Sequence, residues 1–378
     1  MANGSVKQIT VYGGGRWART LVTVLRQVLP DDTEIVWVTR NCFTDVRSWL
    51  TLNPVSNLRL VSEWQLDESS TDGVIVATSP PSHFELVRKA AKLGLPTLCE
   101  KPIASCPSQV TELLSLSEAN RCPIGIHLEF LFASYLHDFA EQIRPMSVRS
   151  FHLEWLDPWC EERHGETKYG EFYSDIVSDQ LPHCWSVLAT ILPDATRLLI
   201  TDISYSTACV ELHGTFGVFP VTLILSRRAA MRIRRATVTD NQGTNKVLDF
   251  SIEPGYIKSS DDHIVNDWSG KRPLVCSLAS FVDVVLQHDL RSRWPIGLMN
   301  CLDAVDCSLQ ASEMLKALLD QLINKLLSNH SVGLDNSEHV NLIVDRFLPE
   351  FSLQGHRFSV RTVSQQKSFA SAWLSTVR

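Results

Sequence analysis

Short apolar runs alternate with helix-like segments over the first third of the chain. The runs are four or five residues long, and the one at residues 73–77 is continuously apolar, as in strands buried on both faces of a parallel sheet. The predicted strands occupy residues 9–12, 34–38, 58–61, 73–77, 96–99 and 124–128. The predicted helices occupy residues 18–29, 44–52, 82–94 and 108–119, the third opening with a capping box at Ser82 and Glu85. This alternation predicts βαβ units and a doubly wound parallel sheet in residues 1–125.

The pattern changes after residue 126, where strand-like runs follow one another with few helices between them. The runs lie at residues 148–157, 197–206, 208–226, 230–240 and 245–252. Such a series predicts a large, open, mostly antiparallel sheet. Helices are expected at residues 274–287 and 297–327, followed by a carboxyl-terminal arm over residues 328–378. The fold class predicted is α/β, with a second, α+β domain over residues 126–378.

Three glycines follow the first predicted strand, where it turns into a helix. Within the pattern G-x-G-x-x-A, Gly13 permits a tight turn and Gly15 leaves room for a pyrophosphate against the backbone. Ala18 lets the helix pack closely on the strand, and the helix amino terminus favours phosphate. We interpret the turn as a dinucleotide site, the alternative being a glycine-rich turn without a ligand.

Composition and charge indicate a globular protein and argue against some classes of partner. The 378 residues are 44% hydrophobic and 20% charged, as in ordinary globular proteins, and the net charge of −7 argues against nucleic acid as a partner. The amino terminus lacks the pattern of a signal peptide, and no run has the length of a membrane span. Ten cysteines are scattered without metal-ligand spacing, so we expect reduced thiols, no zinc or other metal, and a cytoplasmic protein.

The end of the second predicted strand indicates which dinucleotide binds. An acidic residue there would hold the ribose 2′-hydroxyl of NAD, whereas this chain has Thr39 and Arg40. A guanidinium and a hydroxyl suit a 2′-phosphate, so we predict NADP, used as NADPH. The alternative is that Arg40 is only a solvated charge.

The motifs together resemble the Gfo/Idh/MocA oxidoreductases, named for glucose-fructose oxidoreductase and inositol dehydrogenase. The set is Gly13-x-Gly15-x-x-Ala18, Thr78-Ser-Pro-Pro-x-His83 and Glu100-Lys101-Pro102. The resemblance implies an amino-terminal Rossmann domain, a second domain for substrate binding and oligomerisation, and assembly into a homo-oligomer (dimer or tetramer). It implies coenzyme contacts at Gly13, Gly15, Arg16, Trp17, Ala18, Thr39, Arg40, Thr78, Pro80, His83, Glu100 and Lys101.

The resemblance also implies three catalytic residues, of which Lys101 projects toward the substrate oxygen. Its ammonium would stabilise charge developing on that atom. His183 is the expected proton donor, with a pKa near neutrality. Asp179, four residues earlier, is expected to orient it. The alternatives are a structural histidine for His183 and a helix N-cap for Asp179.

Several positions depart from the family's pattern on the substrate side. The approach to the Asp/His pair reads YGEFYSDIVSDQLPH, Ser186 replaces a common Asp, and EFLF at residues 129–132 replaces R-F-x-P. A polar loop includes candidate substrate contacts at Glu162, Arg163, His164, Lys168 and Tyr173, each of which would otherwise be solvated.

The predicted activity is biosynthetic reduction of a C=O or C=N bond in a small polar molecule. A non-catalytic NADPH-binding sensor or scaffold is the main alternative, and a methyltransferase is a weaker one because it has no use for E-K-P.

Overall fold

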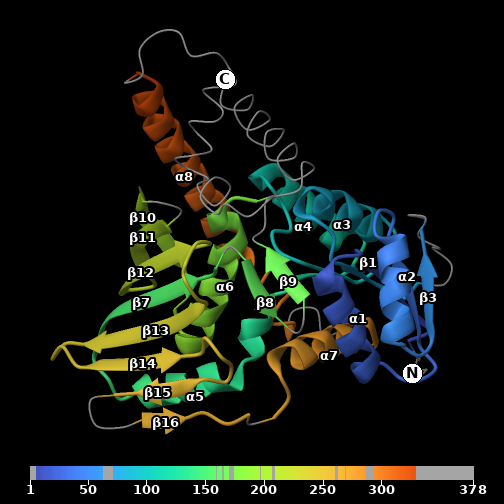
Figure 1. Ribbon diagram of the computed structural model, residues 1–378, viewed down its shortest axis with the longest axis horizontal. Coiled ribbons are helices and arrows are strands. Elements are labelled where there is room, and N and C mark those ends of the chain that lie inside the picture. Colours follow the sequence, from blue (N-terminus) through green and yellow to red (C-terminus); the bar gives the residue numbers. More distant parts are fainter. Residues whose placement is uncertain are drawn as a thin grey trace.

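The structure, a computed structural model, describes residues 6–62, 71–158, 160–163, 166–169, 174–195, 197–206, 209–259, 263–268, 270–286 and 293–328. The expected arm therefore lies outside the described residues, apart from its first position. Figure 1 shows two sheets side by side, with helix α6 between the second sheet and the first domain.

The first sheet has six parallel strands in the order β3-β2-β1-β4-β5-β6, which confirms the doubly wound domain. The strands are β1 (Gln8–Tyr12), β2 (Glu34–Val38), β3 (Leu58–Val61), β4 (Gly73–Val76), β5 (Thr97–Cys99) and β6 (Ile124–Ile126). The helices between them are α1 (Arg16–Val28), α2 (Phe43–Leu52), α3 (His83–Lys92) and α4 (Pro107–Ala119), with a 3₁₀ turn η1 (Pro80–Ser82) before α3. The central strands β1 and β4 are buried along their whole length, which explains their continuous apolar sequence.

The second sheet has eight strands, and all neighbours are antiparallel except β12 and β7. In spatial order they are β10 (Leu198–Ser206), β11 (Cys209–Phe216), β12 (Phe219–Ser226), β7 (Val148–Leu156), β13 (Ile233–Asp240), β14 (Asn245–Asp249), β15 (Tyr256–Lys258) and β16 (His263–Val265). A separate hairpin pairs β8 (Cys160–Arg163) with β9 (Glu166–Tyr169). The mostly antiparallel second sheet predicted from the sequence is confirmed.

Helices cover this sheet on the side of the first domain. Helix α6 (Ile176–Ile191) packs against β7, β11 and β12, and α5 (Ser134–Ile143) lies beside it. A 3₁₀ turn, η2 (Glu129–Phe132), connects β6 to α5 and packs against α6. The sequence pattern did not predict α5.

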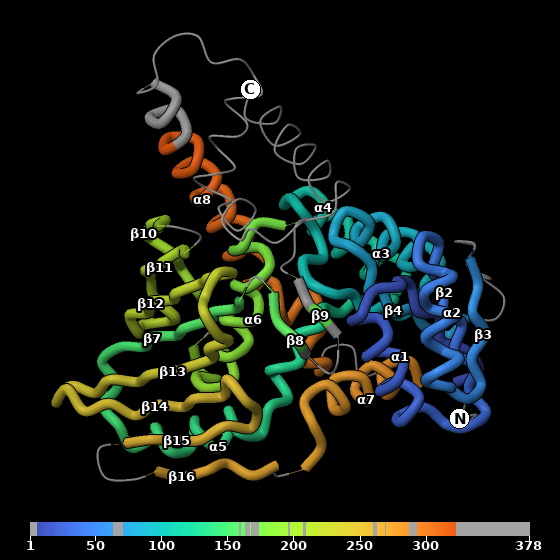
Figure 2. Tube along the Cα trace, viewed as in Figure 1, coloured from blue at the N-terminus to red at the C-terminus, as the bar shows by residue number. Residues whose placement is uncertain are grey.

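The chain returns to the first domain after the second sheet is complete. Helix α7 (Pro273–Leu286) packs against α1, and Val285 lies so close to Gly73 that a Cβ there would be 2.8 Å from its Cγ2. The tube in Figure 2 follows this return below α1. Residues 296–298 then pair with the edge strand β6, with the Leu298 amide donating to Ile124 O at 2.7 Å. Helix α8 (Leu302–Ser328) follows and packs on α6 and β10.

Two local predictions were wrong. The last helix starts at Leu302 and not at residue 297, because Gly297 forms a bridge to Gly125 of β6. The capping box does not form either. Ser82 Oγ donates to Thr78 Oγ1 at 2.7 Å and Glu85 pairs with Arg88, since the turn before α3 supplies closer partners.

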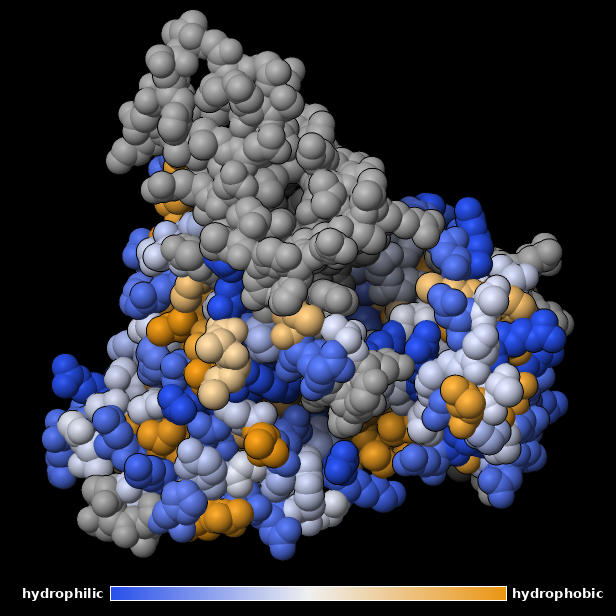
Figure 3. Space-filling model, viewed as in Figure 1, coloured by the Kyte–Doolittle hydropathy of each residue, from blue (hydrophilic) through white to orange (hydrophobic). Residues whose placement is uncertain are grey.

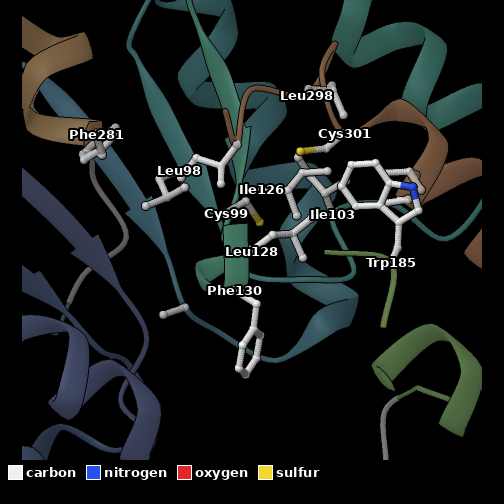
Figure 4. Packing of buried hydrophobic residues seen from close by; sticks show 14 of the residues in the cluster. Leu98, Cys99, Ile103, Ile126, Leu128, Phe130, Trp185, Phe281, Leu298 and Cys301 are labelled. Atoms are coloured by element: carbon white, nitrogen blue, oxygen red, sulfur yellow. The ribbon is translucent and has the colours of Figure 1, made fainter. Parts of the chain in front are cut away.

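The buried core is continuous between the two domains. Figure 4 shows Leu98 and Cys99 of β5 and Ile126 of β6 in the centre, with Leu298, Cys301 and Trp185 of α6 to their right. Segments far apart in sequence therefore share one apolar interior, which fixes α6 against the carboxyl ends of β5 and β6.

The visible face of the molecule mixes hydrophilic residues with scattered hydrophobic ones (Figure 3). Single exposed apolar side chains of this kind are normal on globular proteins. Across the described part of the chain, none of the helices has both the length and the apolarity that crossing a membrane requires.

Candidate active site

The candidate site lies where the carboxyl ends of β1, β4, β5 and β6 face helix α6. Parallel strands bring their carboxyl ends to one edge, and open α/β sheets bind ligands there. The segments that the sequence singled out, the glycine turn, T-S-P-P-x-H and E-K-P, follow β1, β4 and β5 at this edge.

The three glycines of the turn differ in how much space a side chain would have. Gly13 has φ +132°, and a Cβ on it would lie 2.1 Å from Ala77 O, so only glycine fits there. A Cβ on Gly14 would lie 2.2 Å from Thr39 Oγ1. Gly15 faces open space, since no atom of the described residues lies within 4 Å of its Cβ position. Ala18 is fully buried.

Helix α1 begins at Arg16 in a way that suits a phosphate. Among the described residues no side chain caps its first turn, and the first turn contains no acidic residue. The free N–H groups and the positive end of the helix dipole are therefore available to an anion beside the exposed backbone of Gly15. These features, with the tight turn at Gly13, fit the pyrophosphate of a dinucleotide.

The residues at the tip of β2 occupy different environments. Thr39 is buried, and its hydroxyl packs over the glycine turn. Arg40 is exposed, and Arg16 is half-buried. The structure thus makes Thr39 a support for the glycine turn and leaves Arg40 accessible to a ligand.

The residues of T-S-P-P-x-H form a brace after β4. Pro80 opens the turn η1, and Thr78 Oγ1 accepts a hydrogen bond from Ser82. His83 is buried, and its ring nitrogens lie 2.8 Å from Pro102 O and 2.9 Å from Thr78 O. The His83 ring therefore connects the backbone of this loop to the backbone of E-K-P, and it positions both segments without facing the ligand itself through a free ring nitrogen.

Lys101 and Asp179 form an ion pair across the two domains. Lys101 Nζ donates to Asp179 O at 2.8 Å and also to Asp179 Oδ1, while Arg227 donates to Oδ2 at 3.0 Å. The Lys101 and Asp179 side chains are only 15% and 19% exposed. Burial raises the pKa of Asp179, but the positive charges of Lys101 and Arg227 outweigh it and hold that pKa well below its usual range. The carboxylate is ionised and fixes the ammonium at the edge of the first sheet.

Helix α6 places Asp179 and His183 one turn apart. It runs through Pro182 without ending, so the two side chains share a face. The alternative that Asp179 caps this helix is wrong, because Asp175 is the N-cap and accepts from Val177 N and Ser178 N.

His183 is held in an aromatic stack. Its ring lies parallel to Trp155, with centroids 5.2 Å apart and planes at 11°, and meets the edge of Phe130 at 5.6 Å. The Arg234 guanidinium also lies over Trp155, 3.9 Å from a ring centroid, and pairs with Asp157 at 2.6 Å. The sequence indicated neither Trp155 nor Arg234, since their roles depend on neighbouring strands.

The expectation that His183 titrates near neutral pH is wrong. Burial, followed by the positive charge of Lys101, lowers the pKa of His183 well below its ordinary value, although Asp179 opposes this. The imidazole is therefore neutral at physiological pH.

Glu100 joins three segments of the first domain and is buried beneath the site. Its Oε1 accepts hydrogen bonds from Trp17 Nε1, in the first turn of α1, and from His127 Nδ1, just after β6, the latter at 2.5 Å. Burial raises the pKa of Glu100, but the charge and hydrogen bond of His127 lower it overall. The sequence alone did not single out His127; its place near the carboxyl end of the strand predicted over residues 124–128 was the available signal.

The polar loop falls mostly outside the described residues. Glu162 on β8 is exposed. The positions of His164 and Tyr173, and the side chains of Arg163 and Lys168, lie outside the described part of the chain.

Residues 7–127 match the family model GFO_IDH_MocA, described as an oxidoreductase family with an NAD-binding Rossmann fold. No curated protein matches the sequence. A dehydrogenase from Chromobacterium violaceum has a similar fold, with a TM-score of 0.67 and 14% identity, over 86% of this chain and 100% of that one.

Two other solved structures share the fold. One is KijD10, a 3-ketoreductase from Actinomadura kijaniata in complex with TDP-benzene and NADP, with a TM-score of 0.64 and 14% identity over 80% of this chain and 96% of that one. The other is UDP-N-acetylglucosamine 3-dehydrogenase GnnA from Acidithiobacillus ferrooxidans, with a TM-score of 0.62 and 15% identity over 80% and 95%. The resemblance seen in the motifs is confirmed, since residues 7–127 match the Gfo/Idh/MocA family model and the remainder of the chain shares its fold with these solved oxidoreductases.

Proposed function

We propose that the protein is an NADPH-dependent reductase acting on the C=O or C=N bond of a small polar substrate in a biosynthetic reaction. The observation that carries the proposal is the buried Lys101 ammonium, which Asp179 holds at the carboxyl edge of an NAD-binding sheet. When bound, the reduced coenzyme supplies the hydride.

Lys101 has the central role. Negative charge develops on the substrate oxygen or nitrogen during reduction, and a fixed ammonium in a water-poor site stabilises it strongly. Lys101 Nζ gives hydrogen bonds to Asp179 O and Oδ1, so one of its three hydrogens is left for the substrate. It is also a proton source for the product hydroxyl or amine.

His183 then works as a neutral group. In the reductive direction it donates a hydrogen bond to the substrate, and in the oxidative direction it accepts the proton of a substrate hydroxyl. Trp155 and Phe130 fix the plane of its ring, and its Nδ1 is buried without a hydrogen-bond partner among the described residues. This replaces the expectation of a proton donor with a pKa near neutrality.

Arg40 supports the choice of NADPH. It is exposed at the tip of β2, where NAD-binding proteins place an acid, and its guanidinium suits a 2′-phosphate. The NADP in the KijD10 complex is in line with this preference. The ketoreductase and dehydrogenase in the two named structures support a carbonyl or hydroxyl substrate.

The test is a screen of carbonyl and imine compounds for oxidation of NADPH, followed by the same rates with NADH. We expect turnover of at least one compound and faster turnover with NADPH. Equal or faster turnover with NADH would refute the coenzyme assignment. Tight NADPH binding without turnover of any compound would favour the sensor or scaffold instead.

Other expectations accompany the proposal. We propose that residues 1–125 bind coenzyme and residues 126–378 bind substrate and form a homo-oligomer. A cytoplasmic location also stays a prediction. Light scattering of the purified protein measures the assembly.

A further inference from the structure

One buried side chain at the candidate site has a ring nitrogen that makes no hydrogen bond to the described residues. His127 directly follows β6 and is 3% exposed. Its Nδ1 lies 2.5 Å from Glu100 Oε1, but its Nε2 is buried and has no hydrogen-bond partner among the described residues. Buried polar atoms in native proteins rarely lack a partner, and leaving one unmade is costly. The ring is thus hydrogen-bonded through Nδ1, and Nε2 has no partner in the described part of the chain.

The available nitrogen is a hydrogen-bond donor. Glu100 is ionised, so Nδ1 must carry the hydrogen that it shares with that carboxylate. Burial lowers the pKa of His127, but the charge and hydrogen bond of Glu100, with the charge of Glu129, raise it overall. This shift favours the protonated ring, in which Nε2 also carries a hydrogen and requires an acceptor such as a carbonyl oxygen.

The strand order indicates which ligand brings that acceptor. A dinucleotide on this sheet has its adenine ribose at the end of β2, by Arg40, and its pyrophosphate at the turn after β1. The sheet continues through β4 and β5 to β6, so the other half of the molecule extends toward Lys101 and His127. The hydrogen bonds from Trp17 and from His127 to Glu100 link the glycine turn to the end of β6 along the same path.

We propose that His127 is a coenzyme-binding residue that donates a hydrogen bond from Nε2 to the nicotinamide half of the coenzyme, at its carboxamide oxygen. Glu100 orients the imidazole through its hydrogen bond with Nδ1. Trp17 donates a second hydrogen bond to Glu100 and so connects it to the glycine turn. The inference rests on the proposed function, since it assumes the nicotinamide coenzyme.

Two substitutions test the roles of the two ring nitrogens of His127 separately. In His127→Asn the amide reaches only as far as Nδ1 and keeps the contact with Glu100, whereas in His127→Gln it reaches the place of Nε2. We expect His127→Asn to weaken NADPH binding about tenfold and His127→Gln to weaken it less, because one hydrogen bond is lost in the first and replaced in the second. Calorimetric titration without substrate measures both.

A coenzyme fragment distinguishes a nicotinamide contact from damage to the site. 2′-Phospho-ADP-ribose lacks the nicotinamide, so it should bind the wild type and His127→Asn equally. His127→Asn binding NADPH as well as the wild type does, or losing the fragment and NADPH in equal measure, would overturn the inference. His137→Asn, at an exposed position of α5, is the matched control.

The two proposals fail differently. If the wild type does not bind NADPH at all, the proposed function is wrong. If the wild type binds NADPH and reduces a substrate while His127→Asn changes only the substrate KM, the proposed function stands and the assignment of His127 to the coenzyme is wrong.

Discussion

The Lys101 side chain on the first domain is bound to Asp179 on the second, across 78 positions of sequence. Both groups are largely buried, and each has lost water that the other replaces. Separating such a pair is costly because the remaining charge is left buried without compensation. The position of the ammonium therefore depends on how the two domains pack together.

Replacing Lys101 with Met should abolish most of the activity and spare coenzyme binding. We expect turnover to fall roughly 10³-fold, the usual cost of losing a group that stabilises developing charge. NADPH affinity, measured by the fluorescence of the reduced ring, should change little. Lys89→Met, at an exposed position of α3, is the control and should keep full activity. Turnover within a few-fold of the wild type would show that Lys101 has no catalytic role.

Two alanine substitutions in the glycine turn should have opposite consequences. Gly13→Ala places a Cβ 2.1 Å from Ala77 O at φ +132°, so we expect a loss of about 3 kcal/mol or more of unfolding free energy, or no soluble protein. Gly15→Ala meets open space and should fold normally, but its methyl group should weaken NADPH binding. Urea unfolding and titration with NADPH measure the two effects. Equal stability of the two variants would contradict the steric argument.

Replacing Arg40 with Ala should change coenzyme preference. Loss of a guanidinium beside a phosphate removes a charge-assisted hydrogen bond, and we expect NADPH affinity to fall about tenfold with NADH affinity unchanged. Arg47→Ala, at an exposed position on α2, serves as the comparison. An equal loss of affinity for NADPH and NADH would mean that Arg40 does not recognise the 2′-phosphate.

Glu129 should make stability depend on pH. Burial, with the charges of Glu253 and Glu100, raises its pKa from 4.5 to about 7 in the folded protein, although His127 opposes this. The native state then holds a proton that the unfolded chain releases above about pH 4.5, so this contribution is complete below that pH and is lost as pH rises through 7. Glu129→Gln should therefore be more stable than the wild type at pH 8, by about 1 to 2 kcal/mol after allowance for partial exposure, and should lose this advantage near pH 5.

Denaturant titrations at the two pH values measure the effect of Glu129→Gln. The exposed Glu118→Gln on α4 should show no such difference between pH 5 and pH 8. A constant difference between wild type and Glu129→Gln at both values would rule out a titration of this carboxyl group.

Much of the first domain could be predicted because its signals are local. Apolar runs give strands, residues spaced three and four apart give helices, and the glycine at position 13 reports a backbone conformation that other residues avoid. The motifs at Lys101 and Gly15 lie within these units, so their places at the edge of the sheet follow from the order of the strands. Ser82 and Glu85 do not form the predicted capping box, because each bonds to another neighbouring residue. Even a local sequence pattern can therefore fail when the preceding turn supplies a closer hydrogen-bond partner.

The sequence by itself determined the two kinds of sheet, the dinucleotide turn and the lysine beside it, because each depends on residues near one another along the chain. Only the tertiary structure decided that His183 is neutral between Trp155 and Phe130, that Glu100 is held by His127, and that residues 296–298 extend the first sheet. The physical reason is that burial, electrostatic fields and strand pairing act between residues close in space, and the packing of the whole chain sets those distances.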